Sequence, residues 1–499
     1  MNDKLNDALN QISDKHLAEA ENIQKAPHRR PYWIAAVAAV LAVVIGITAA
    51  SGSFLPKPEP SVPTHLGSAP DVPDPTGIQS PNTLQLQNLV ASPQYPEMAQ
   101  RPSENGMDYK EYSALLDTWK ASQSAQYDQP QDYADSLTDF FTQSIPLFLN
   151  AEENSAYSPV NMYMALAMLA ETAGGNSQQQ ILDVLGLDSI EELREQVGHV
   201  WNAHYQDDGV TTLLLGNSLW LDSAFPYRQD TTQLLAENYY ASSFHGDLGT
   251  EEMDRQLQQW LNANTGGLLQ EQAENIKLDP ATVFALASTI YFSSDWESEF
   301  SPKFTQDMPF HCGEYDLMTP FMRQTLLFGT YYRGSNFGAV ALKMSGENSM
   351  WLILPDEGYT VADILESDEY LHLTLTGRCV SRGLYQINLS MPKFDVVSET
   401  NLVDGLQRMG ITDVFDPFVA DFTSISDMPG LAVGSATHAA RVTVDEEGCL
   451  AAAFTVFATY GTSASNPPTE LDFTLDRPFL FVISSRDDLP LFAGTVVEP

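Results

Sequence analysis

The chain has 499 residues, with 66 acidic and only 24 basic side chains, and its formal net charge is −42. That excess argues against a nucleic-acid partner, because binding phosphates needs clustered Lys and Arg. The cysteines Cys312, Cys379 and Cys449 are widely spaced and form no CxxC pair, so we predict no metal site, no disulfide framework and no cofactor.

An uncharged apolar run lies near the N-terminus. Residues 32–50 are about as long as the ~20 residues that cross a bilayer as a helix. Arg29 and Arg30 precede the run, so the positive-inside rule predicts a cytoplasmic tail over 1–31 and an extracellular remainder at the cell surface. We interpret 32–50 as a transmembrane anchor. The alternative is a cleaved signal peptide with small residues around 49–53, which predicts a secreted protein.

Residues 51–106 are rich in Pro, Ser, Gln and Asn. Such a composition buries too little apolar surface to fold and favours extended structure. We interpret this segment as a disordered stalk, followed by a lead-in segment at 107–131 and a globular domain at 132–499.

The globular domain begins with helical patterns and continues with strand patterns. Apolar spacing predicts a helix within 133–149, and a second helix begins at Ser158–Pro159 and ends near Gly174–Gly175. A further amphipathic helix within 399–415 is closed by Gly410. Apolar runs predict strands at 282–296, 348–355, 478–484 and 491–497. Helices and strands do not alternate strictly, which favours the α+β class.

Motifs of common enzymes are absent from the chain. It contains no GxSxG, HExxH or GxxxxGK[ST] pattern and no GxGxxG after a strand. We therefore predict no catalytic residue and a protein that is not an enzyme.

Several sequence landmarks of the C-terminal domain resemble those of the serpin family and follow the same order. They are YSPVNMYMALAML, WLNANTGGLL, STIYFSSDWESEF, MPKF, HAARVTVDEEG, FTLDRPFLFVI and PLFAGTVVEP. The resemblance implies a serpin fold with a large central mixed β-sheet, further sheets, eight to nine helices and an exposed reactive-centre loop. It also implies a serine protease inhibitor.

The resemblance assigns a polar latch, the shutter and breach, that governs opening of the central sheet. The matching residues are Ser158, Asn161, Ser288, His438 and Trp296. The alternative interpretation is structural: these are buried polar groups that form hydrogen bonds with one another. In a sheet that must open, the two interpretations overlap. Ser288 stands where the family has Asn and reaches less far towards His438, and Ala439 stands where the family has Lys.

The resemblance also identifies residues 445–468 as the reactive-centre loop, which a protease cleaves and which then inserts into the central sheet. No charged residue lies between Glu447 and Glu470, and no proline precedes Pro467, as a segment that becomes a central strand requires. Its hinge is predicted to comprise Glu446, Glu447, Gly448, Cys449, Leu450, Ala451, Ala452 and Ala453. From Cys449 onward, alternate residues would line the two faces of the inserted strand.

The family's spacing places the scissile bond at Thr462–Ser463, with Tyr460 and Ala464 as alternatives because the loop is about five residues longer than usual. A small uncharged residue there predicts elastase-like or subtilisin-like serine proteases as partners. The alternatives are a loop that is merely a substrate and a non-inhibitory serpin acting as a surface binding or chaperone-like protein. A membrane-anchored, disulfide-free serpin suggests a bacterial cell surface, and we expect a monomer.

Overall fold

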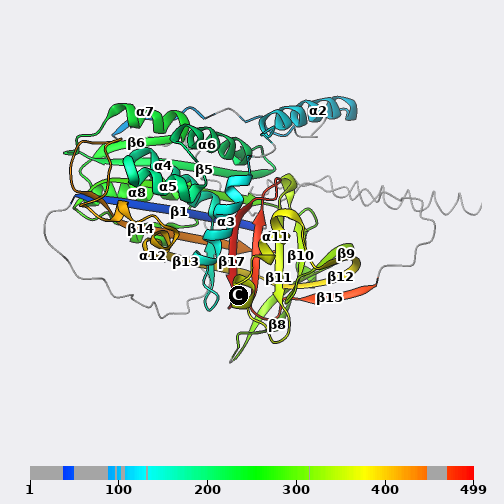
Figure 1. Ribbon diagram of the computed structural model, residues 1–499. Helices are drawn as coiled ribbons and strands as arrows, with labels where there is room; N and C mark the ends of the chain where they lie inside the picture. The colour runs from blue at the N-terminus through cyan, green and yellow to red at the C-terminus, as the bar shows by residue number, and fades with distance from the viewer. Residues whose placement is uncertain are drawn as a thin grey trace, which may run out of the picture. The chain divides into compact units, whose positions relative to one another are not determined.

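A computed structural model describes residues 37–49, 88–95, 98–102, 107–130, 133–313, 315–446 and 469–499 (Figure 1). The predicted cytoplasmic tail, the reactive bond and its alternatives, and the hinge residues after Glu446 lie outside these ranges. The α+β class is confirmed, because helices and two mixed β-sheets make up the described part of the chain.

Sheet A, which contains the candidate functional site, has eight strands among the described residues. Seven of them follow the order β13-β14-β1-β7-β5-β6-β2, and β4 pairs with β5. Among these described strands, only the β5–β6 pair is parallel. Their bounds are β13 (Phe394–Asn401), β14 (Leu431–Val444), β1 (Val37–Ala49), β7 (Thr282–Ser294), β5 (Thr211–Asp222), β6 (Ala241–Gly246), β2 (Leu89–Ala91) and β4 (Gln206–Asp207).

Sheet B has nine strands in the described ranges, in the order β15-β12-β9-β10-β11-β16-β17-β3, with β8 paired to β9. Of the strand pairs that the structure describes in sheet B, only β12–β15 is parallel. The bounds are β15 (Glu470–Thr474), β12 (Ser381–Pro392), β9 (Asp316–Arg333), β10 (Phe337–Lys343), β11 (Ser349–Pro355), β16 (Phe479–Ser484), β17 (Pro490–Val496), β3 (Ser155–Tyr157) and β8 (Gln306–His311).

Eleven α-helices lie in the described part, more than the eight to nine expected, because α2 precedes the predicted domain and α9 and α10 are short. They are α2 (Tyr109–Gln126), α3 (Asp135–Phe148), α4 (Pro159–Thr172), α5 (Gly175–Leu185), α6 (Ile190–His204), α7 (Gln229–Asn238), α8 (Glu251–Asn264), α9 (Gln270–Asn275), α10 (Val361–Leu365), α11 (Glu369–Thr376) and α12 (Val403–Met409).

Helix α4 is the centre of the core. Ser158 caps it by accepting a hydrogen bond from the Asn161 N–H, and Pro159 occupies the first turn, as predicted. Every residue of α4 is buried, because the helix contacts β7 and β1 of sheet A and β17 of sheet B. Its hydrophobicity on all sides follows from that position.

Most of the predicted elements form. Helix α3 and strands β7, β11, β16 and β17 lie where their apolar patterns place them. The helix expected within 399–415 is shorter, since residues up to Asn401 belong to β13. Helix α12 ends at Gly410, whose φ of 108° favours glycine.

The prediction of a membrane-spanning helix over 32–50 is wrong for its described part. Residues 37–49 form strand β1, paired on both sides, and no helix in the described ranges is long and apolar enough to cross a membrane. Four Val, two Ile and one Thr make seven of the 13 residues β-branched, which favours a strand. A strand buried on both faces is apolar throughout, so its pattern resembles that of a membrane helix.

The expected stalk also differs in part, because residues 88–95 belong to the folded domain. Strand β2 extends sheet A at its β6 edge. Tyr95 stacks on Trp201, Tyr205 and Tyr240, and its hydroxyl donates to the Tyr240 carbonyl at 3.2 Å. The pairing of β2 with β6 and the stacking of Tyr95 attach this segment to the domain.

Candidate functional site: the strand slot of sheet A

The space between β7 and β14 is called the slot, and β1 fills it. Strand β1 runs antiparallel to both neighbours over nearly its whole length (Figure 1). Strand β14 ends at Val444, directly before Asp445 and Glu446, where the predicted hinge begins. A segment that turned back after β14 and entered the slot would run in the direction of β1.

Strand β1 separates two residues that the sequence predicted to be partners. Val43 lies opposite Ser288 of β7 on one side and opposite His438 of β14 on the other. Adjacent strands are about 4.8 Å apart, so Ser288 and His438 lie on strands about 10 Å apart. The structure therefore does not join them, because a whole strand stands between.

Three of the predicted latch residues do come together, under the slot. Asn161 donates from Nδ2 to the Ser288 carbonyl at 3.2 Å, and Ser158 caps the helix that carries Asn161. The Ser288 hydroxyl lies 2.7 Å from the Oδ1 atoms of both Asn161 and Asn217. A hydroxyl has one proton, so it donates to one of these amides at a time.

His438 lies apart from this cluster. Its side chain is buried against the ring of Tyr157, 5.4 Å between centroids, and neither ring nitrogen has a hydrogen-bond partner among the described residues. Burial lowers the pKa of His438 to about 3, against a smaller opposing effect of its own backbone. The imidazole is therefore neutral at physiological pH.

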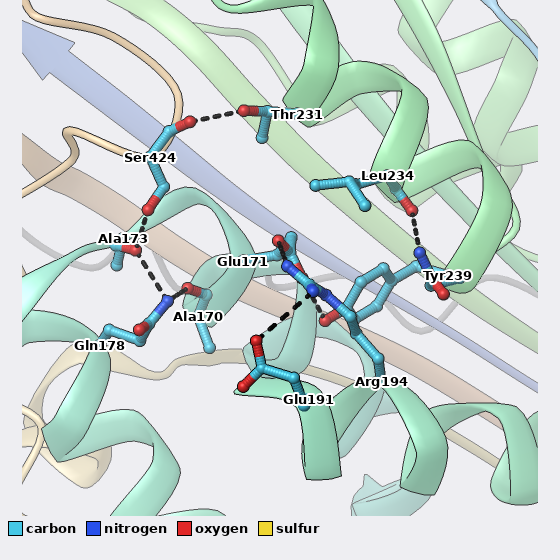
Figure 2. A network of polar contacts seen from close by, with 11 residues as sticks. Ala170, Glu171, Ala173, Gln178, Glu191, Arg194, Thr231, Leu234, Tyr239 and Ser424 are labelled. Atoms are coloured by element: carbon cyan, nitrogen blue, oxygen red, sulfur yellow. Dashed lines mark hydrogen bonds and ion pairs between the residues drawn. The ribbon is translucent and has the colours of Figure 1, made fainter. Parts of the chain in front are cut away.

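A chain of hydrogen bonds continues from the latch cluster into the helices. Asn217 donates to the Tyr239 carbonyl at 2.7 Å, and the Tyr239 hydroxyl donates to Glu171 of α4 at 2.8 Å. Arg194 of α6 binds the same carboxylate with two nitrogens at 2.7 and 2.9 Å, as Figure 2 shows. The buried Glu171 charge is thus balanced by a bidentate guanidinium.

The pKa shifts of Arg194 and Tyr239 are consistent with their contacts to the Glu171 carboxylate. The bond to Glu171 raises the pKa of Arg194 further above its ordinary value. Burial, and then Glu171, raise the pKa of the Tyr239 hydroxyl well above 10, so Tyr239 acts only as a neutral donor. These contacts brace α4, α6 and the end of α7 against one another.

A second polar cluster lies where β14 leaves sheet A, and we call it the mouth of the slot. It comprises Trp296, Thr305, Lys393, Asp445 and Glu446. Lys393 lies 2.7 Å from one Glu446 oxygen, the Thr305 hydroxyl donates to the other at 2.6 Å, and the Trp296 indole donates to the Asp445 carbonyl at 3.0 Å. Trp296 therefore holds the base of the loop and lies apart from the Ser288 cluster.

Opposing effects act on the pKa of Glu446. Burial raises it, but the bonds from Lys393, Thr305 and the backbone outweigh burial, and the net pKa is lowered. The carboxylate therefore stays ionised and fixes the last described residue before the loop. Of the eight predicted hinge residues, Glu446 alone lies in the described ranges.

Sequence reasoning missed Asn217, Thr305 and Lys393. The MPKF landmark does contain Lys393, one of only 24 basic residues in a very acidic chain, so its pairing with a nearby carboxylate could have been suspected. Asn217 and Thr305 carry no local signal. Their roles depend on which distant segments pack beside them.

The fold and these clusters define a class of protein with a large mixed sheet. In this sheet an additional strand, here β1, lies beside strand β14, which leads into the exposed loop. A family model described as Serpin (serine protease inhibitor) matches residues 137–499. The chain belongs to the serpin family.

Curated relatives come from distant organisms. Alpha-1-antiproteinase 2 of Equus caballus is 30% identical over 359 residues, which cover 69% of this chain and 82% of the relative. Serpin-Z1C of Triticum aestivum is 30% identical over 373 residues, covering 70% and 91%. Members of this family are usually inhibitors of serine proteases, although non-inhibitory serpins exist.

Solved structures share the fold. The thermophilic serpin tengpin in its native state has a TM-score of 0.62 at 24% identity, covering 81% of this chain and 98% of tengpin. Human kallistatin has a TM-score of 0.61 at 24% identity, covering 73% and 97%. At this identity the likeness supports the serpin fold alone.

Proposed function

We propose that this serpin irreversibly inhibits serine proteases with small S1 pockets, of the elastase-like or subtilisin-like kind. The protease serine attacks the Thr462 carbonyl, the bond to the Ser463 nitrogen breaks, and an acyl ester joins the protease to Thr462. Insertion of the loop from the hinge onward into sheet A then carries the attached protease away before water hydrolyses the ester.

The observation that supports this proposal is the slot. It holds a strand of 13 residues that runs in the direction a re-entering loop would take. The loop segment that begins at Cys449 is similarly uncharged and rich in small and β-branched residues. Side chains of that kind suit a position buried between two strands.

The energetics are adequate for trapping a protease. A dozen inserted residues form roughly as many ladder hydrogen bonds, each worth about 0.5–1.5 kcal/mol net. With apolar burial added, insertion into a slot that β1 has left gains on the order of 10 kcal/mol, comparable to the whole stability of many domains. The mouth suits this motion, because Glu446 is held by Lys393 and Thr305 and gives the loop a fixed point from which to turn.

The test is to incubate the full chain with pancreatic elastase and with subtilisin. We expect a covalent complex that survives denaturing gel electrophoresis, and mass spectrometry of the released loop fragment should identify the Thr462–Ser463 bond. Cleaved serpin together with fully active protease, found even when β1 has been released from the slot, would reject the proposal. Thr462→Arg should shift the inhibition towards trypsin-like enzymes, and an unchanged target profile would reject the bond assignment.

One observation favours a second candidate, a non-inhibitory serpin that binds partners at its surface. Strand β1 already occupies the slot into which the loop would insert. The two candidates differ in melting temperature after the loop is cut. A large rise supports insertion, and a melting temperature that stays unchanged even when β1 has been released from the slot supports the non-inhibitory protein.

A further inference from the structure

We propose that the slot is a binding site for residues 37–49 of this chain, and that β1 and the reactive-centre loop exclude each other from it. The proposal rests on the inhibitory function proposed above. Its consequence is regulation: with β1 seated, a protease cleaves the loop as an ordinary substrate, and release of β1 arms the inhibitor.

Strand β1 fits the slot closely. Ala42 to Ile47 are buried, and Ala42 lies opposite Ala439, where the family resemblance leads one to expect a long Lys. At the far end, a bulge in β14 leaves Gly434 between the residues that pair with Gly46 and Ile47. A Cβ on Gly46 would lie 2.8 Å from the Ser435 hydroxyl, and one on Gly434 would lie 2.8 Å from Thr48 Cγ2.

Seating β1 also carries a cost at the latch. His438 is buried without a hydrogen-bond partner among the described residues while Val43 separates it from Ser288. An unsatisfied buried polar group costs about 1–3 kcal/mol. If β1 left and β7 closed onto β14, the strands that carry Ser288 and His438 would be neighbours about 4.8 Å apart. The closed sheet thus gains a partner for the imidazole, which opposes the binding of β1.

The competition is close in energy. Strand β1 and an inserted loop offer a similar number of ladder bonds to the same two neighbours, on the order of a dozen at about 0.5–1.5 kcal/mol each. Both are tethered to the domain, so neither pays the entropy of a separate molecule. A single unfavourable residue in β1 is therefore enough to change the occupant, because a buried unpaired carboxylate costs several kcal/mol.

The first experiment releases β1 with a charge. Val43→Glu in the full chain places a carboxylate at a fully buried position in the centre of β1. The matched control Val397→Glu adds the same charge to sheet A on the edge strand β13, where the side chain is 41% exposed. Hydrogen exchange of the peptide spanning 37–49 and the stoichiometry of elastase inhibition are measured for both variants and for the unmodified chain.

We expect 37–49 to be protected in the unmodified chain and in Val397→Glu, and to lose protection at least tenfold in Val43→Glu. The number of serpin molecules consumed per inhibited elastase should fall several-fold in Val43→Glu alone. Rapid exchange of 37–49 in the unmodified chain would overturn the proposal. So would an unchanged stoichiometry in a Val43→Glu variant whose β1 has lost protection while the unmodified chain inhibits.

The second experiment locks β1 in place and does not depend on trapping a protease. Ala42→Cys and Ala439→Cys are combined in a chain whose three native cysteines are replaced by Ser. Directly opposed strand residues have Cα separations of about 4.5–5.5 Å, within the range of a disulfide. The melting temperature is compared before and after loop cleavage, in the oxidised and reduced chains.

We expect the oxidised chain to show no rise in melting temperature after cleavage and the reduced chain to show a clear one. Failure of the disulfide to form, or an equal rise in both states, would overturn the proposal. If the reduced chain shows the rise but never forms a covalent complex with elastase, the inhibitory function fails while competition for the slot stands.

Discussion

Lys393→Met removes the ammonium group at the mouth of the slot and keeps a flexible apolar chain of similar length. Glu446 then retains the Thr305 hydroxyl at 2.6 Å but loses its ionic partner at 2.7 Å. A charged hydrogen bond contributes about 1.5–3 kcal/mol. The Lys393 side chain is 39% exposed, so solvent screening reduces the expected loss to about 1–2 kcal/mol.

The assay is urea denaturation of four chains: unmodified, Lys393→Met, Glu446→Gln and the double variant. The change in unfolding free energy of the double variant, minus the sum of the changes in the two single variants, gives the coupling energy of the pair. Glu446→Gln keeps an acceptor for Thr305, so the cycle isolates the charge. A coupling energy below about 0.3 kcal/mol would refute the inference that this pair holds the base of the loop.

The pH dependence adds a second condition. The pKa of Glu446 is lowered from 4.5 in the folded chain, so its contribution is complete above that value and is lost as the pH falls through the folded pKa. The unmodified chain and Lys393→Met should therefore differ most at pH 7 and converge in acid. A difference that persisted undiminished below the folded pKa would mean that the lost stability came from packing rather than charge.

The remaining predictions concern the buried polar groups. Burial lowers the pKa of His438 from 6.5 to about 3. Between these two pH values only the unfolded chain takes up a proton at this residue, so the folded state loses stability progressively as the pH falls below 6.5. His438→Phe should lessen the loss between pH 7 and pH 4 by about 3 kcal/mol in urea titrations, and an identical pH profile would contradict the burial argument. Arg194→Met leaves the Glu171 charge with the Tyr239 hydroxyl and should destabilise the domain by about 2–3 kcal/mol, while Arg194→Lys should recover part of this loss. A loss below 0.5 kcal/mol in Arg194→Met would show that Glu171 does not depend on that ion pair.

The sequence predicted best those elements whose signals are local. The start of α4 follows from a capping Ser, a first-turn Pro and an apolar pattern, and the structure places all three as expected. Strands β7 and β11 follow from long apolar runs bounded by polar residues. These features depend on residues within a few positions of one another.

The identity of β1 could not be predicted in that way. A run of 13 uncharged and almost entirely apolar residues suits a membrane helix and a doubly buried strand equally well, since neither environment requires a polar face. The choice depends on whether β7 and β14 leave room between them, which is a property of residues about 240 and 400 positions away. The insertion of β1 between β7 and β14 also separates Ser288 from His438.

Two residues differ from the family pattern, Ser288 and Ala439. Both lie directly opposite residues of β1 across sheet A. Ser288 shares its row with Val43, and Ala439 shares its row with Ala42. A Ser in place of Asn shortens the side chain that would reach towards His438, which weakens the closed latch. An Ala in place of Lys at position 439 removes a long charged side chain next to Ala42 of β1, which is buried. Both changes reduce the advantage of a closed sheet and ease the seating of a strand between β7 and β14, so they favour a chain whose slot is normally filled.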